Sequence, residues 1–220
     1  MDLAEGILTR RSIRGFKPTP IPEETLKRIL ELASRSPSYT NTQPWEVTVV
    51  TSKKKEELSR VLLGLADAET PTKNDIPTPT SWPEELGRRS REHGAKRFKA
   101  IGVEREDTKT RKEMRLANFM FYGAPCAMFL YMDSTLSGYS IFDMGLFAQT
   151  LILAAHSLGV ESCLQAALTG YPDAVREFLG LPETKKIVIG ISLGYPDPDA
   201  RINSYHSERV GTDAFVKWFK

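Results

Sequence analysis

Three arginines and a serine stand close together near the start of the chain, at Arg10, Arg11, Ser12 and Arg14. The planar guanidinium group suits bidentate binding of phosphate, and a dianionic phosphate needs two or more such donors. Each charge-assisted hydrogen bond contributes roughly 1.5–3 kcal/mol. Arg209, in a polar segment near the other end, is a further candidate donor. The cluster predicts a phosphate site, and a solvated basic turn is the alternative.

Most other catalytic patterns are absent from the sequence. It contains no GxxxxGK[ST], GxGxxG, CxxC or HExxH motif. One G-x-S-x-G pattern is present at residues 190–194, with Ser192 at its centre. A nucleophile elbow requires a helix directly after the serine, whereas residues 195–198 read Tyr-Pro-Asp-Pro. The pattern therefore predicts the end of a buried strand with tightly packed glycines.

The cysteines and the central histidine are expected to be structural. The two cysteines, Cys126 and Cys163, are too few for a disulfide framework or a four-cysteine zinc site. Each lies in a segment that reads as a buried strand, which favours packing over redox chemistry. His156 lies on an apolar helical segment and is expected to be packed or capped.

Composition limits the remaining possibilities. The chain has 220 residues, of which 40% are hydrophobic and 26% charged, with a formal net charge of +2. This balance is typical of a globular domain and disfavours nucleic acid or a membrane surface as the main partner. No apolar run approaches the ~20 residues of a membrane span, and no apolar leader precedes the arginine cluster, so a cytoplasmic location is expected. A chain of this length must combine cofactor and substrate binding in one domain, or borrow part of its site from another chain.

The first half of the chain predicts a helix, a loop, a strand and a second helix. After Pro22, apolar residues recur at helical spacing until Ser36. A polar loop at 38–44 leads to a strand at 45–51 that is rich in valine. Residues 53–65 again have an amphipathic helical pattern.

The second half contains a charged stretch and then the apolar elements. Four prolines make 69–83 irregular, and residues 84–115 carry closely interleaved charges of both signs, which predicts one or two solvated helices. This part reads as an insertion lying over the core. The remaining expected strands are 125–133, 160–166 and 187–193, and the remaining expected helices are 141–158, 173–179 and 212–219. Together they predict a layered α/β or α+β domain.

Four segments, taken in order, resemble the FMN-dependent nitroreductases. Residues 10–16 resemble the family's R-R-S-x-R-x-F opening, and residues 37–45 its P-S-x-x-N-x-Q-P-W loop. Residues 143–149 resemble its D-x-G-x-x-x-Q helix, and residues 190–195 with Arg209 its closing strand and late arginine. Further segments resemble the nitrobenzoate-reductase-type branch, namely 88–89, 102–107, 118–119, 123–125 and 164–167.

The resemblance implies an α+β fold with a central mixed, mainly antiparallel sheet flanked by helices, in an intertwined homodimer. Residues 1–220 would form a single domain, and a charged helical insertion at about 70–115 would cover the active site. The implied cofactor is FMN, with NADH or NADPH as the transient electron donor. No metal is implied.

The resemblance also assigns site residues within one chain. Arg10, Ser12 and Arg209 would hold the FMN phosphate, and Arg11 would line the same end. Arg14 would face N1 and O2 of the flavin ring and support the reaction electrostatically, so that no side chain acts as a catalytic acid or base.

Two further segments would complete the flavin site. The partner subunit would contribute a loop through Pro37, Ser38, Tyr39 and Asn41. The flavin edge would be lined by Leu164, Gln165 and Ala166, with a backbone N–H near 165–167 pointing at N5.

The implied activity is transfer of hydride from NAD(P)H through flavin N5 to nitroaromatic, quinone or similar electron-poor acceptors, in a ping-pong cycle. Residues 83–99 would cap the substrate side, where Arg88 or Arg89 would meet an anionic substituent. Two alternatives remain open. One is a flavin dehydrogenase or oxidase of an unidentified metabolite on the same fold, and the other is a non-catalytic binding protein.

Overall fold

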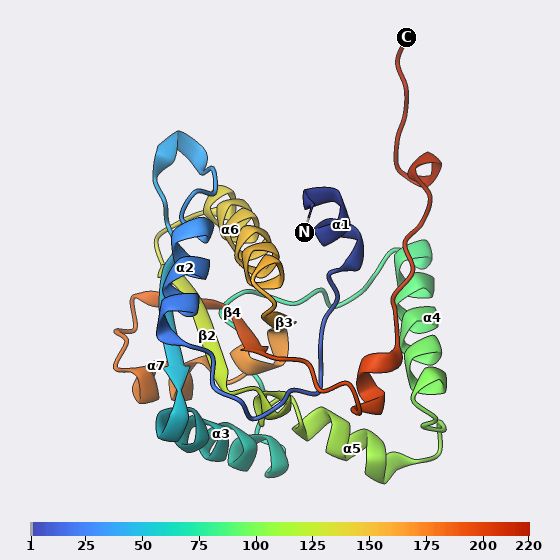
Figure 1. The fold of residues 1–220 in the computed structure, drawn as a ribbon, viewed down its shortest axis with the longest axis horizontal. Coiled ribbons are helices and arrows are strands. Elements are labelled where there is room, and N and C mark those ends of the chain that lie inside the picture. Colours follow the sequence, from blue (N-terminus) through green and yellow to red (C-terminus); the bar gives the residue numbers. More distant parts are fainter. Residues whose placement is uncertain (1) are drawn as a thin grey trace.

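The computed structural model describes residues 2–220 of the chain (Figure 1). The helices are α1 (Leu3–Thr9), α2 (Glu23–Ala33), α3 (Ser52–Asp67), α4 (Glu84–Ala100), α5 (Thr108–Leu116), α6 (Gly138–Ser157) and α7 (Pro172–Leu179). The strands are β1 (Glu46–Thr51), β2 (Cys126–Asp133), β3 (Glu161–Gln165) and β4 (Lys185–Gly194). The elements that carry the core follow the predicted order and differ from the predicted bounds by a few residues.

The four strands form one sheet in the order β1-β2-β4-β3, and every neighbouring pair is antiparallel. A mixed sheet was predicted. Its parallel part is a single bridge between Ser12 of the N-terminal segment and Ser162 of β3. β1 lies at one edge of the sheet and β3 at the other. This α+β architecture is the predicted one.

Side chains of the central strand β2 alternate between two cores, as the two-residue period of a strand requires. Cys126, Met128, Leu130 and Met132 pack against α2 and α6. Ala127, Phe129 and Tyr131 face the other core, which contains α3 and α7. The sheet is therefore covered by helices on both faces, which explains why β2 reads as a continuous apolar run.

Helix α6 is the central helix of the first core. Its length and composition alone would allow it to cross a membrane. Instead, Met144, Leu151 and Ala155 are almost fully buried against α2 and the sheet. The helix ends before Gly159, whose φ of +75° lies in the left-handed region that favours glycine.

The two ends of the chain differ from the sequence-based predictions. Helix α1 was not predicted, and Leu8 on it is exposed. The helix predicted at 212–219 is wrong, because only a single 3-10 turn at Thr212–Ala214 forms and the rest extends away from the body (Figure 1). A helix this short needs packing to be stable, and the tail buries none of its aromatic residues.

The charged insertion forms two separate helices, α4 and α5, as one of the predicted options allowed. The preceding proline-rich segment, 70–83, contains no helix or strand. Only Gly87 of α4 is buried, and no residue of α5 is. Figure 1 shows α4 on the side of the molecule opposite α2, with the C-terminal segment running beside it.

Candidate functional site

The arginine segment is anchored by its backbone. Ile13 is buried, and its N–H donates to the carbonyl oxygen of Ser162 at 3.0 Å. The N–H of Arg14 donates to Asn203 Oδ1 at 2.8 Å, and Asn203 Nδ2 donates back to the carbonyl of Gly15 at 2.8 Å. Because alternate residues of an extended segment point to opposite sides, burial of Ile13 directs its neighbours outward.

The outward side chains line a cavity of about 450 Å³. Its lining residues come from the N-terminal segment, α4 and the C-terminal segment: Arg10, Arg11, Ser12, Arg14, Arg89, Ser90, His93, Tyr205, Ser207, Glu208 and Arg209. We call this the arginine cavity. The structure thus brings together five of the predicted site residues, including Arg209 from almost 200 positions further along the chain.

Most cations of the arginine cavity have no carboxylate partner. Within residues 2–220, no Asp or Glu oxygen lies within 4.0 Å of the guanidinium groups of Arg10, Arg11, Arg14 or Arg209. Glu208, the one acidic lining residue, pairs with Lys96 at 2.5 Å. The cavity therefore offers several free donors to an anion.

The C-terminal side of the arginine cavity is ordered by local hydrogen bonds. Arg209 Nη1 donates to Ser207 Oγ at 2.8 Å and to the Glu208 carbonyl at 3.0 Å. Arg11 Nη1 contacts His206 Nε2. The Arg11–His206 contact joins this segment to the N-terminal arginines, and the Arg209 hydrogen bonds leave further guanidinium N–H groups available.

The structure separates the two arginines predicted to meet the substrate. Arg88 donates to Glu85 at 2.8 Å and to Glu92 at 2.6 Å, and it does not line the arginine cavity. Arg89 lines it, with Nε donating to Glu85 at 3.0 Å. The hydrogen bonds from Arg88 and then Arg89 lower the pKa of Glu85 to about 2. Of these two arginines, only Arg89 lines the arginine cavity.

The predicted flavin-edge residues lie at the end of β3 and the start of the next turn. Gln165 is 3% exposed, and its Nε2 donates to the carbonyl of Asn118 at 3.0 Å while its Oε1 accepts from Ser192 Oγ. Its side chain is therefore committed to the core. Leu164 is exposed, and Ala166 begins the 3-10 turn that follows β3.

The predicted partner loop is not part of the arginine cavity in this chain. Its Tyr39 N–H donates to both carboxylate oxygens of the buried Asp143, at 3.1 and 3.2 Å. The Tyr39 ring stacks on Tyr139 at 5.3 Å. Ser38 Oγ accepts from the N–H of Gln43 at 3.0 Å, and Gln43 in turn donates to Asn41 at 3.3 Å.

In Figure 1 this loop, coloured light blue and beginning at Pro37, lies beyond the ends of α2 and α6. Helix α4 is on the other side of the molecule. The predicted site residues therefore fall into two groups that one chain does not bring together.

Sequence reasoning placed residues 83–99 over the site and named Arg88 or Arg89, but it missed His93, which also lines the arginine cavity. His93 Nδ1 and the hydroxyl of Tyr205 lie 3.2 Å apart. Burial lowers the pKa of His93, and the nearby charges of Arg97, Arg14 and Arg209 lower it further. The spacing of Arg89, His93 and Arg97, every fourth residue along one helical face, is the signal that would have found His93.

The residues that sequence reasoning assigned to structure are structural. Ser192 is fully buried on β4, which excludes it as an exposed nucleophile. Cys126 and Cys163 are buried free thiols, and burial raises both their pKa values. His156 is capped by Glu161 at 2.7 Å and by Thr9 at 2.9 Å.

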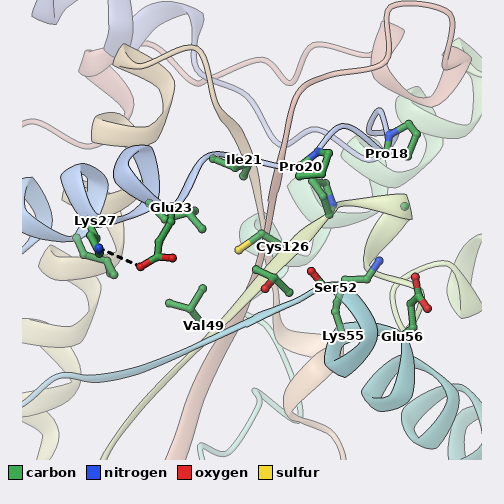
Figure 2. Close-up of a pocket in the computed structure, with 15 residues that line it drawn as sticks. Pro18, Pro20, Ile21, Glu23, Lys27, Val49, Ser52, Lys55, Glu56 and Cys126 are labelled. Atoms are coloured by element: carbon green, nitrogen blue, oxygen red, sulfur yellow. Dashed lines mark ion pairs between the residues drawn. The ribbon is translucent and has the colours of Figure 1, made fainter.

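A second cavity, of about 640 Å³, lies between α2, β1 and the start of α3 (Figure 2). It contains none of the predicted site residues. Its Lys55 Nζ donates to the carbonyl of Ala124 at 2.9 Å, and Glu23 pairs with Lys27 at 3.0 Å. Burial raises the pKa of Cys126 to about 12, so its thiol is not a nucleophile at neutral pH. Within residues 2–220, no cluster of metal-ligating side chains forms here or elsewhere.

Comparison with known proteins identifies relatives that are similar along nearly the whole chain. The chain is 37% identical to nitroreductase NfnB of Mycolicibacterium smegmatis, covering 96% of this chain and 92% of that protein. It is 35% identical to a 4-nitrobenzoate reductase of Pseudomonas putida, covering 98% and 94%. The chain also resembles the crystal structure of FMN-dependent NfnB from Mycobacterium smegmatis in complex with NADPH. The superposition covers 100% of both chains, with a TM-score of 0.94 at 34% identity.

The sequence model of the nitroreductase family matches residues 7–195, which include the arginine segment, the 37–45 loop and the whole sheet. This match extends over most of the chain, and the relatives above are similar along nearly their full lengths. The chain belongs to the nitroreductase family.

Proposed function

We propose that this chain is an FMN-dependent oxidoreductase that passes electrons from NADH or NADPH to nitroaromatic, quinone or similar electron-poor acceptors. The observation that carries the proposal is the arginine cavity, which is lined by Ser12 and by arginines from both ends of the chain that have no carboxylate partner among the described residues. The similar proteins named above are a nitroreductase and a nitrobenzoate reductase, and one similar structure is described as FMN-dependent and bound to NADPH.

The donor set of the arginine cavity fits the phosphate of FMN. Arg10, Ser12 and Arg209 would hold the phosphate, with Arg11 lining the same end. A dianion requires several hydrogen-bond donors and positive charge, and these side chains supply both without a competing carboxylate. Bound FMN would supply the two-electron chemistry at its N5 atom.

The remaining site residues would orient the ring and stabilise charge. Arg14 would face N1 and O2, where a fixed guanidinium favours negative charge that develops on reduction. The backbone of Leu164, Gln165 and Ala166 would run along the flavin edge, because the Gln165 side chain is occupied by Asn118 and Ser192. This arrangement needs no catalytic carboxylate or histidine, since solvent can supply the protons.

A homodimer would bring together the two groups of site residues. Pro37, Ser38, Tyr39 and Asn41 would complete the flavin site of the partner, because their loop lies away from the arginine cavity of their own chain (Figure 1). Exposed aromatic side chains on the extended tail, Phe215, Trp218 and Phe219, also favour a subunit interface.

Two further parts of the proposal concern organisation and location. Residues 1–220 would act as one domain, with the charged helical part at about 70–115 covering the active site; the contact of α4 with the arginine cavity supports this. The protein would work in the cytoplasm, and its two free cysteines are compatible with that compartment.

Purification and anaerobic reduction test the proposed function. The purified protein should be yellow and lose its flavin absorbance on mixing with NADH or NADPH in a stopped-flow instrument. A panel of nitroarenes and quinones should then restore it. A yellow protein that neither nucleotide bleaches would indicate a dehydrogenase or oxidase. A colourless protein that takes up no FMN would indicate a binding protein.

A further inference from the structure

Arg97 is a partly buried cation without a compensating anion. It lies on α4 two turns after Arg89, on the helical face that carries His93. Its Nε atom is buried and has no hydrogen-bond partner among the described residues. No carboxylate oxygen in residues 2–220 lies within 4.0 Å of its guanidinium. A buried polar atom in a native protein normally has a partner, so this one points to a missing ligand.

The groups nearest to Arg97 do not neutralise it. Burial lowers its pKa, and the positive charge of Arg14 lowers it further. Tyr122 donates its hydroxyl to Asn118 at 2.7 Å, and burial raises the pKa of Tyr122, so it remains neutral. Cys163 is also kept protonated by burial. None of these groups therefore supplies a negative charge that would compensate the Arg97 guanidinium.

The favourable contact that Arg97 does make is weak. Its guanidinium carbon lies 5.1 Å from the ring centroid of the adjacent Phe98. The same ring is contacted more closely by Arg111, at 3.8 Å. A shared cation–π contact does not replace the hydrogen bond that the buried Nε atom loses from water.

The position of Arg97 along α4 distinguishes it from Arg89. The eight residues between them correspond to about 12 Å of helix, at 1.5 Å per residue. Arg89 lies at the end of the arginine cavity shared with Arg209. Arg97 lies one turn after His93 on the same helical face, and His93 lines the arginine cavity together with Arg14. Arg97 thus continues, one turn further along α4, the face that His93 presents to the arginine cavity.

We propose that Arg97 is a flavin-binding residue that pairs with Arg14 around the pyrimidine edge of the ring. This inference rests on the proposed function, because it assigns a residue to the same FMN site. Two cations at that edge stabilise negative charge on the reduced ring more strongly than one does. Arg97 would therefore favour the reduced over the oxidised cofactor.

The test compares Arg97→Met and Arg97→Lys with a matched control, Arg91→Met. Arg91 is exposed on the same helix and lies outside the row formed by Arg89, His93 and Arg97. For each protein, fluorescence quenching gives the Kd of oxidised FMN, and anaerobic titration of the holoprotein gives its midpoint potential. Thermal denaturation of the FMN-free protein reports whether the substitution damages the fold.

For Arg97→Met we expect the Kd of reduced FMN, divided by the Kd of oxidised FMN, to rise at least tenfold. This lowers the two-electron midpoint potential by about 30 mV. Arg97→Lys should recover part of the shift, and Arg91→Met should behave as wild type. The FMN-free Arg97→Met protein should melt no lower than wild type, because it lacks an unpaired buried charge that Arg14 repels.

Two results would overturn the assignment of Arg97 alone. One is a wild-type protein that binds FMN while Arg97→Met keeps the same Kd and the same potential. The other is an FMN-free Arg97→Met protein that melts several degrees lower, which would make Arg97 a packing residue. A wild-type protein that binds no FMN would instead overturn the proposed function together with this inference.

Discussion

Two groups of arginines near α4 have opposite electrostatic environments: those exposed on the helix itself, and those of the arginine cavity that the helix helps to line. On the outer side, Arg88 is paired with Glu85 and Glu92. On the inner side, Arg14 and Arg209 line a cavity with no carboxylate partner among the described residues. Local pairing therefore distinguishes a solvated helical surface from an anion site, although the two regions contain the same residue type. The most densely charged stretch of the sequence is not where the available charge is greatest.

This difference has an energetic consequence. Exposed ion pairs such as those of Arg88 contribute little to stability, because water and salt screen them. Unpaired cations that converge on one cavity repel one another and oppose folding. An anion that binds there removes the repulsion and stabilises the folded state by mass action. FMN should therefore raise the melting temperature, and riboflavin, which lacks the phosphate, should do so less.

Removing two phosphate donors should have the largest effect. In the double variant Arg10→Ala/Arg209→Ala, FMN affinity should fall by about 100-fold or more, since each charge-assisted hydrogen bond contributes about 1.5–3 kcal/mol. Fluorescence quenching measures the affinity. The paired Arg88→Ala should bind FMN like wild type. Equal losses in both variants would remove the distinction between paired and unpaired arginines.

Removing the proposed ring contact should have the next largest effect. Arg14→Ala should weaken FMN binding by about 10- to 100-fold and slow reduction of the bound flavin, because a fixed positive charge is lost. Stopped-flow reduction by NADPH at saturating FMN separates the two effects. Unchanged flavin content together with an unchanged reduction rate would contradict the assignment.

A smaller effect is expected for substrate selection. Arg89→Ala should reduce the preference in kcat/KM for carboxylated over neutral nitroarenes by about tenfold or less, as expected for one partly exposed charge. Arg88→Ala should leave the preference unchanged, since Glu85 and Glu92 already occupy its guanidinium. Equal preferences in the two variants would contradict a specific role for Arg89 in binding the substrate carboxylate.

Removing the ion pairs of Glu85 should have the smallest effect, a slight loss of thermal stability that depends on pH. The pKa of Glu85 is lowered in the folded state from 4.5 to about 2. Its stabilising contribution is therefore complete above about pH 4.5 and is lost as the pH falls toward 2. At pH 7, Glu85→Gln should melt slightly below wild type, and the difference should vanish near pH 2. A difference that grows on acidification would contradict the pairing.

Sequence patterns predicted the core elements because burial sets their periodicity. The alternation of Met128 and Phe129 between two cores, and the apolar circumference of α6, are direct consequences of packing on both faces of one sheet. The chain ends were less predictable. Helix α1 and the tail around Trp218 bury little in this chain, so no internal packing pattern specifies them.

The arginine cavity was predictable in part. Arg10 to Arg14 are close in sequence, and Arg209 was a candidate as a basic residue in a polar segment, which the resemblance then assigned to the phosphate. The sequence analysis placed residues 83–99 over the site and named Arg88 or Arg89, but it missed His93 and Arg97, which are embedded among similar charged residues. Only the tertiary structure shows which of those charges remain unpaired, since pairing depends on neighbours from other elements, as with Lys96 and Glu208.

The most direct test of the account compares the binding of FMN and riboflavin to the FMN-free protein. The two ligands share the flavin ring and differ by the phosphate, which is the group that the unpaired arginines are proposed to bind. The account predicts that FMN binds about 100-fold or more tightly than riboflavin, and that the Arg10→Ala/Arg209→Ala variant loses most of this difference. Equal affinities of the wild-type protein for FMN and riboflavin would contradict it.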